Sequence, residues 1–407
     1  MKNLTPAAAN NRIYVHTFGC KVNQYESQVL LENCRKNGYE LTGSMKEAGT
    51  LLINSCTVTG EADRQCRQLI RKVLRDNPGM KIIVSGCYAV RLPEEIAAIS
   101  PSVKILEKES PLRGDFGITR FEGHSRAFVK IQDGCDAYCS YCIVPYVRSK
   151  IISRPQQNII SEINGLLANG YTEIVLTGVR LGKYDGGLEN LINGILKDGR
   201  EFRIRLSSLE INEVTEGLLR LMKDNPRRIC RHLHFPLQSG SDGILEKMKR
   251  PYTAEEFIGR TGVIRAALPD AGVTTDIIVG FPGETDRDFK ETYAVAEKLK
   301  FSKLHVFKYS KREGTEAYSF KNEVGLEEIK ERSRSLRDLD IKLQAAFVTK
   351  WLGTVRPAVF EGTKNTLLTD NYIRLGTDLK YTSFYNNIID VEITELAGRP
   401  WGVAREI

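Results

Sequence analysis

The sequence predicts an α/β protein of three modules: an N-terminal doubly wound parallel sheet, a central partial (β/α)6 barrel and a small C-terminal antiparallel β-barrel. Two series of short apolar runs that alternate with helical patterns predict the first two modules, because such alternation is typical of parallel sheets. A change to turn-rich, strand-like segments after Trp351 predicts the third module. A chain of 407 residues has room for two or three such units, since single cores stop growing at about 250–300 residues.

The first alternating series fills the N-terminal part of the chain. Apolar runs at 13–17, 51–54, 82–85 and 103–106 predict strands, and the segments 27–37 and 62–76 predict helices between them. Three of these strands are closely followed by a cysteine: Cys20, Cys56 or Cys87. The carboxyl ends of parallel strands meet at one edge of a sheet, where ligands bind. We therefore expect these three thiols to converge on one site.

The second series begins near Ala127. Strands are predicted at 127–131, 173–177, 203–207, 232–237, 273–279 and 304–309, and the active site of such a barrel is expected at the carboxyl ends of its strands. Leu336, Leu339, Leu343 and Phe347 recur at helical spacing and predict one long helix that closes this module. The last part has strand-like segments at 354–360, 371–375 and 390–395. We place the domains at residues 1–122, 123–345 and 346–407.

The charge balance of the chain is mildly basic. Lys and Arg number 59 against 51 Asp and Glu, a formal net charge of +8, which suits a polyanionic partner such as RNA. The basic clusters are equally well explained as solvated surface. No apolar run approaches the roughly 18 residues that a membrane span needs, and the polar start lacks the apolar core of a signal peptide. We expect no membrane association and a cytoplasmic location.

Nine cysteines in a chain of this kind argue against a disulfide framework, because the cytosol is reducing and the number is odd. Cys34 and Cys66 share helical stripes with apolar residues, so we interpret both as small buried hydrophobes. We interpret Cys230 as structural too. His232 and His234 alternate on one predicted strand and are interpreted as satisfied polar residues of the barrel rather than as catalytic groups.

Cys135, Cys139 and Cys142 carry the clearest chemical signal. They lie within eight residues, directly after a predicted strand and Gly134. Three thiolates can hold one iron–sulfur cluster and leave its fourth iron open to a ligand that is not protein. A zinc site with a remote fourth ligand is the alternative, but zinc pairs usually follow a Cys-x2-Cys pattern.

The Cys-x3-Cys-x2-Cys pattern after a first barrel strand resembles the signature of the radical S-adenosylmethionine (SAM) superfamily. The surrounding residues resemble its methylthiotransferase family. The motifs that carry this resemblance lie at 128–135, 144–148 and 153–155 and, nearer the N-terminus, at 17–27, 54–58 and 85–87. The resemblance covers essentially the whole chain, because the last module is similar to the RNA-binding TRAM domain that ends these enzymes.

The resemblance implies SAM and two [4Fe-4S] clusters as cofactors. One cluster would lie on the catalytic cysteines Cys135, Cys139 and Cys142, bind SAM and cleave it to a 5′-deoxyadenosyl radical. The auxiliary cluster would lie on Cys20, Cys56 and Cys87 and carry the sulfur to be transferred. Residues at the strand ends of the family that contact SAM correspond here to Tyr141, Thr177, Gly178, Ser208, Glu210, Gln238, Ser239 and Val279. As bare sequence, glycine and serine after strands are ordinary turn residues.

Residues 19–27 look most like the family members that act on threonylcarbamoyladenosine in tRNA. The resemblance then implies transfer of a methylthio group to C2 of that base at position 37, next to the anticodon. Members that act on isopentenyladenosine in tRNA, or on an aspartate of a ribosomal protein, are the alternatives. A non-catalytic iron–sulfur RNA-binding protein is a further one.

The threonylcarbamoyl group carries a carboxylate, which Arg148, Arg180 or Lys308 could bind. Asn23 and Tyr25 either meet the substrate or shield the auxiliary cluster; a plain polar helix start explains them equally well. The base must leave the anticodon-loop stack to enter the barrel. Aromatic residues of the last module are expected to stack on RNA or to fill its core: Tyr372, Phe384, Tyr385 and Trp401. We expect a monomer that takes electrons from a donor such as flavodoxin or ferredoxin.

Overall fold

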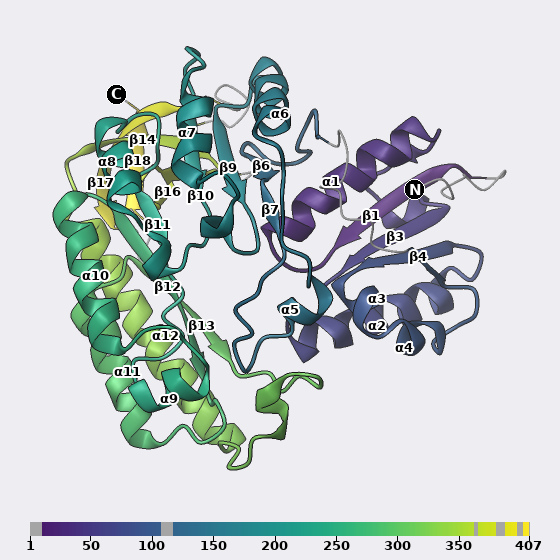
Figure 1. Ribbon diagram of the computed structural model, residues 1–407. Helices are drawn as coiled ribbons and strands as arrows, with labels where there is room; N and C mark the ends of the chain where they lie inside the picture. Colours follow the sequence, from purple (N-terminus) through teal and green to yellow (C-terminus); the bar gives the residue numbers. More distant parts are fainter. Residues whose placement is uncertain (1–9, 107–116, 362–364, 380–386, 397–401, 407) are drawn as a thin grey trace.

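A computed structural model describes residues 10–106, 117–361, 365–379, 387–396 and 402–406 (Figure 1). The N-terminal sheet lies on one side of a central barrel, and the long helices of the barrel lie on its other side (Figure 1). Phe384, Tyr385 and Trp401, which were expected to contact RNA or fill the C-terminal core, lie outside the described residues.

The N-terminal module is a five-stranded sheet in the order β2-β1-β3-β4-β5, and its strands are parallel. Its elements are β1 (Arg12–Thr17), α1 (Lys21–Lys36), β2 (Glu40–Leu41), β3 (Thr50–Ser55), α2 (Gly60–Asp76), β4 (Lys81–Gly86), α3 (Cys87–Arg91), α4 (Pro93–Ala97) and β5 (Lys104–Ile105). The doubly wound sheet is confirmed. The two-residue β2 was not predicted, because so short an edge strand has no periodicity of its own.

Both faces of this sheet are covered because its strands are apolar on both sides. In β3, Leu51 packs in the cluster that contains Ile70 of α2, whereas Leu52 packs in the cluster that contains Leu30 of α1. Neighbouring residues of a strand point to opposite faces, so one continuous apolar run fills two helix–sheet layers. Cys66 and Cys34 are fully buried, one in each layer, as expected for small hydrophobic residues.

Six parallel strands form the central module as two three-stranded sheets, β6-β9-β10 and β11-β12-β13. Isolated parallel bridges, including Ser208 to His234, join the two sheets into one open barrel. The strands are β6 (Ala127–Lys130), β9 (Glu173–Thr177), β10 (Arg203–Leu206), β11 (His232–His234), β12 (Gly272–Val279) and β13 (Lys303–Lys308). The helices that follow them are α6 (Gln156–Ala168), α7 (Leu188–Leu196), α8 (Glu216–Asp224), α9 (Asp242–Lys247), α10 (Ala254–Ala267), α11 (Asp286–Leu299) and α12 (Leu326–Thr349).

Strand β11 is shorter than predicted. The sequence pattern extends the strand to residue 237, but the structure ends it at His234. Pro236 has no backbone N–H for a ladder, and Gln238 has a positive φ of 66°. The chain therefore turns out of the sheet just where the candidate site begins.

The C-terminal module is a closed five-stranded barrel in the order β14-β15-β16-β18-β17. Its strands are β14 (Val355–Phe360), β15 (Thr366–Thr369), β16 (Arg374–Gly376), β17 (Ile389–Leu396) and β18 (Gly402–Glu406). Pairing is antiparallel except between β16 and β18. The boundary that we placed at 345/346 falls inside α12, and Val348 at the end of this helix already packs in the barrel core.

Candidate active site

The structure brings Cys20, Cys56 and Cys87 together at the carboxyl edge of the N-terminal sheet. Cys20 precedes α1, Cys56 follows β3 and Cys87 begins α3, and the strands before them, β1, β3 and β4, are neighbours in the sheet. We call these three residues the auxiliary triad. Burial raises the pKa of Cys56 to about 11, and the other two thiols of the triad add to the effect.

Two glycines allow the loops of this triad to approach one another. Gly19 has a φ of 102°, and a Cβ there would lie 3.0 Å from Sγ of Cys56. Gly86 has a φ of 93°, and a Cβ there would lie 2.3 Å from the carbonyl oxygen of Ser55. Only glycine tolerates both the left-handed backbone and the contact. The turns that present the cysteines therefore depend on residues with no side chain.

Cys135, Cys139 and Cys142 form the second group, the barrel triad. It follows the two-residue β7 (Gln132–Asp133), which pairs with β8 (Ile152–Ser153). The backbone N–H of Cys142 donates to the Cys139 carbonyl at 2.9 Å, which folds the loop on itself. Arg250 donates from Nη1 to Sγ of Cys139 at 3.4 Å. Burial raises the pKa of Cys142 to about 12.

The spacing of these thiols suits clusters better than single ions. Among the described residues, His234, Asp276 and His305 have ligand atoms that all lie within 4.8 Å of one another. The sulfur atoms of neither cysteine triad lie that close together. A zinc ion needs four ligands close around one centre. Three thiols per site, more widely set and presented by glycine turns, fit the three-cysteine ligation of a four-iron cluster.

Arg148 links the two triads. It ends the short helix α5 (Val144–Val147), which follows Cys142, and its Nε donates to Sγ of Cys87 at 3.3 Å. Its Nη atoms donate to Glu26 at 2.8 Å and to Asp133 at 2.7 Å. Lys130 reaches the same two carboxylates at 2.6 Å each. A buried, charge-balanced network therefore joins α1 to the loop that precedes Cys135.

Several residues expected to contact SAM lie at the carboxyl ends of the barrel strands or next to them. Thr177 ends β9, Val279 ends β12, and Ser208 is exposed after β10. Tyr141 packs against the cluster that contains Met248. Gln238 is buried and its Oε1 has no hydrogen-bond partner among the described residues.

Two of the expected SAM contacts have other partners. Ser239 is buried, and its hydroxyl lies 3.1 Å from that of Thr292 on α11, because the positive φ of Gln238 turns the chain towards the helices. Ser239 thus has a partner on α11, and its expected contact with SAM stays a prediction. Glu210 forms an ion pair with Arg250 and so positions the guanidinium that touches Cys139.

Three of the expected substrate contacts are buried and have partners within the protein. Tyr25 is fully buried, and its hydroxyl donates to Glu162 at 3.0 Å. Asn23 is buried too and donates to the carbonyls of Phe18 and Ser55. In these positions Tyr25, Asn23 and the buried Arg148 hold the two domains and the auxiliary triad together, and their contact with substrate stays a prediction.

Arg180 and Lys308 remain closer to solvent. Arg180 pairs with Glu213 at 2.6 Å and with Asp136 at 2.7 Å, beside the barrel triad. Lys308 is exposed at the end of β13.

Sequence reasoning missed Gln132 and Arg250. Gln132 is fully buried, donates to the carbonyls of Asp133 and Gly134 at 2.8 Å, and accepts the backbone N–H of Arg180 at 2.8 Å. It joins the loop of the barrel triad to the loop after β9. A polar residue within an apolar strand pattern was the available signal for Gln132, whereas nothing near Arg250 in the sequence points to Cys139.

Family models match two segments of the chain. Residues 12–107 match the uncharacterized protein family UPF0004, and residues 129–296 match the radical SAM superfamily. The threonylcarbamoyladenosine tRNA methylthiotransferase MtaB of Bacillus subtilis is 35% identical, over 95% of this chain and 94% of its own. The protein of the same name from Thermotoga maritima is 34% identical, over 92% of this chain and 90% of its own. The chain belongs to the radical SAM methylthiotransferase family.

Other relatives are named for a different base. The tRNA-2-methylthio-N(6)-dimethylallyladenosine synthase of Endomicrobium trichonymphae is 32% identical, over 87% of this chain and 90% of its own. Among solved structures, the radical SAM methyltransferase TsrM of Kitasatospora setae superposes with a TM-score of 0.52 at 12% identity, over 74% of this chain and 75% of its own. That likeness concerns the fold alone.

Membership of the radical SAM methylthiotransferase family identifies the chain as an enzyme that transfers methylthio groups and that uses SAM and a [4Fe-4S] cluster. Within the described residues, no helix combines the length and apolarity that crossing a lipid bilayer requires.

Proposed function

We propose that this methylthiotransferase acts on tRNA and adds its methylthio group to C2 of N6-threonylcarbamoyladenosine at position 37. The relatives named for that substrate support the proposal. One structural observation carries it: α5 follows Cys142 of the barrel triad, and Arg148 at its end donates to Cys87 of the auxiliary triad. A base held beside α5 would face both triads, as transfer of sulfur to an activated carbon requires.

In this proposal each triad holds one [4Fe-4S] cluster, so the auxiliary triad holds a second cluster in addition to that of the barrel triad. When bound, the cluster of the barrel triad supplies the electron that cleaves SAM. The protein positions the reactants. Gln132 fixes the loop of Cys135 against the loop after Thr177, and the pair of Glu210 with Arg250 fixes Cys139. Gln238, with its free Oε1, is available to a polar group of SAM.

We propose that the C-terminal barrel is a TRAM-like RNA-binding module. It is docked on the floor of the central barrel: Arg203 donates to the carbonyls of Pro357 and Leu368, and Arg205 donates to those of Thr369 and Asp370. Tyr372 stacks on His232 with ring centroids 4.0 Å apart. Tyr372 therefore packs in this interface, whereas the sequence predicted that it would stack on RNA or fill the core of the module.

The proposed partners are the anticodon stem-loop of a tRNA and an external electron donor such as flavodoxin or ferredoxin. A monomeric state and a cytoplasmic location stay predictions. The relatives named for dimethylallyladenosine make that base the second candidate substrate.

The test pairs two products on one protein preparation. Replacing Cys20, Cys56 and Cys87 with Ala should abolish methylthiolation of tRNA, while SAM is still cleaved to 5′-deoxyadenosine at the barrel triad. Replacing the buried structural cysteines Cys34 and Cys66 with Ala is the matched control and should keep both products. Mass spectrometry of the tRNA nucleosides then identifies the modified base. Methylthiolation that survives in the triple variant would refute the two-cluster assignment, and a product other than methylthio-threonylcarbamoyladenosine would refute the substrate.

A further inference from the structure

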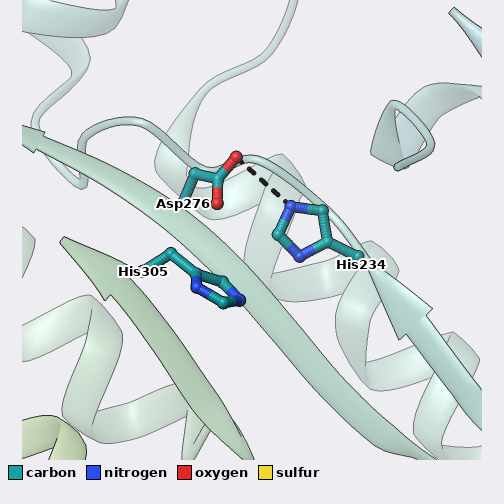
Figure 2. Close-up of side chains that lie close together, drawn as sticks. All are labelled: His234, Asp276 and His305. Atoms are coloured by element: carbon teal, nitrogen blue, oxygen red, sulfur yellow. Dashed lines mark ion pairs between the residues drawn. The ribbon is translucent and has the colours of Figure 1, made fainter. Parts of the chain in front are cut away.

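Three polar side chains from neighbouring strands meet inside the barrel, apart from the cysteines. His234 ends β11, Asp276 lies on β12 and His305 on β13, and their ligand atoms all lie within 4.8 Å of one another. Figure 2 shows the ring of His234 directed at Asp276, with His305 beside them on the next strand. His234 Nε2 lies 3.2 Å from Asp276 Oδ2, and the side chains of the pair are 12% and 25% exposed. A ligand could therefore reach them.

Hydrogen bonds fix the proton on His234. Thr274 Oγ1 lies 2.8 Å from His234 Nδ1 and 3.0 Å from His232 Nε2. Burial opposes ionisation of Asp276, but the hydrogen bond from His234 lowers the pKa of Asp276 below its usual range, so Asp276 is a carboxylate and only accepts. His234 therefore donates from Nε2–H to the Asp276 carboxylate, and the Thr274 hydroxyl bridges the rings of His234 and His232.

The charges around this group disfavour a metal ion. Lys21, which directly follows Cys20, lies within electrostatic range of Asp276 and His305. Among the described residues, the Lys21 ammonium has no hydrogen-bond or ion-pair partner. The Lys21 ammonium is stabilised by a ligand that carries a negative charge, and the Asp276 carboxylate accepts hydrogen bonds from N–H donors. The group therefore favours a ligand that brings both.

We propose that Asp276, His305 and Lys21 form the subsite for the N6 substituent of the substrate adenine, with His234 as a positioning residue. The subsite rests on the proposed function: the threonylcarbamoyl group offers urea N–H donors and a carboxylate. Asp276 accepts the urea N–H groups, and Lys21 pairs with the carboxylate. C2 of adenine and C6, which carries N6, flank the same ring nitrogen, so a group bound here keeps C2 close to the auxiliary triad that Lys21 adjoins.

The test compares two anticodon stem-loops that differ only in the threonylcarbamoyl group. Dissociation constants are measured for the cluster-loaded wild type, Asp276→Asn and Lys21→Met. A hydrogen bond to a charged group contributes about 1.5–3 kcal/mol, which corresponds to about 10-fold to 100-fold in affinity. In each variant, the ratio of the dissociation constants for the unmodified and modified loops should fall by at least about 10-fold. The unmodified loop should bind as it does to the wild type. The iron content of each variant is measured as well, so that loss of a cluster is distinguished from loss of the preference.

Asp338→Asn, an exposed change on α12, is the matched control and should leave the preference intact. An unchanged preference in both variants, or equimolar Co²⁺ binding that His305→Phe abolishes, would overturn the subsite. Failure of the proposed function would be seen separately: the wild-type protein would then form no methylthiolated nucleoside from the modified loop.

Discussion

Replacing Arg148 with Met tests the buried network that joins the two triads. Arg148 and Lys130 face Glu26 and Asp133, and none of the four side chains is more than 8% exposed. Two cations therefore balance two carboxylates. The methionine variant keeps much of the side-chain volume, but it leaves two buried carboxylates with Lys130 alone.

Breaking a buried ion pair on one side costs about 3–5 kcal/mol, because a charge is left uncompensated. The Arg148→Met variant should lose stability in this range. The double variant Arg148→Met with Glu26→Gln is neutral again, since Lys130 and Asp133 remain paired at 2.6 Å. The summed losses of the two single variants should therefore exceed the loss of the double variant by about 1 kcal/mol or more.

Denaturant unfolding of the cluster-loaded protein, followed by circular dichroism, measures these differences. Hydrogen exchange should locate the loss of protection at α1 and α5. Both tryptophans, Trp351 and Trp401, lie in the C-terminal part of the sequence, so fluorescence reports the distant module separately. Arg287→Met is the control: its pair with Glu291 lies at the surface, and its loss should cost well under about 1 kcal/mol. Additive effects of Arg148→Met and Glu26→Gln would refute the charge-balance reasoning.

Three further changes test other parts of the structure. Burial opposes ionisation of Glu173, but Arg205, Arg203 and Arg126 lower its pKa below the usual 4.5. The ionised carboxylate therefore stabilises the folded protein fully above that pH, and this stabilisation is lost as the pH falls. Glu173→Gln should therefore lower the melting temperature at pH 7 by more than at pH 4; an equal loss would contradict the ion-pair role. Gly86→Ala should displace Cys87 and remove about four of the expected eight irons without stopping 5′-deoxyadenosine formation, as iron analysis and product chromatography can check. Ending the chain after Trp351 should weaken tRNA binding in a filter assay while SAM cleavage without RNA continues, and unchanged affinity would exclude the RNA-binding role of the barrel.

The sequence predicted what local patterns determine. Strand periodicity located β1, β3 and β4 to within a residue or two, and parallel-sheet geometry then placed Cys20, Cys56 and Cys87 at one edge. It could not predict contacts that depend on how the modules pack. The guanidinium of Arg148 was expected to face substrate, yet it is buried against Glu26 of another domain. The positive φ of Gln238, which a strand pattern does not reveal, is followed by Ser239 in contact with Thr292 of α11.

Both triads share one arrangement that arises from unrelated elements. A buried guanidinium donates to one sulfur of each triad: Arg148 to Cys87 at 3.3 Å and Arg250 to Cys139 at 3.4 Å. Each guanidinium is held by carboxylates, Arg148 by Glu26 and Asp133, and Arg250 by Glu210. Hydrogen bonds to the sulfur ligands are among the factors that set the reduction potential of a cluster.

The two carboxylate sets differ in accessibility, and this difference separates the two sites. Arg148 belongs to a network sealed between domains, whereas the Glu210 side chain that holds Arg250 is 18% exposed at the end of the barrel. A ligand that binds beside the barrel triad can thus displace or strengthen the pair of Glu210 with Arg250, and so alter the hydrogen bond to Cys139. The bond from Arg148 to Cys87 is insulated from such a ligand, because every carboxylate that holds Arg148 is buried. Binding of SAM should therefore change the electronic environment of the barrel triad and leave that of the auxiliary triad unaffected.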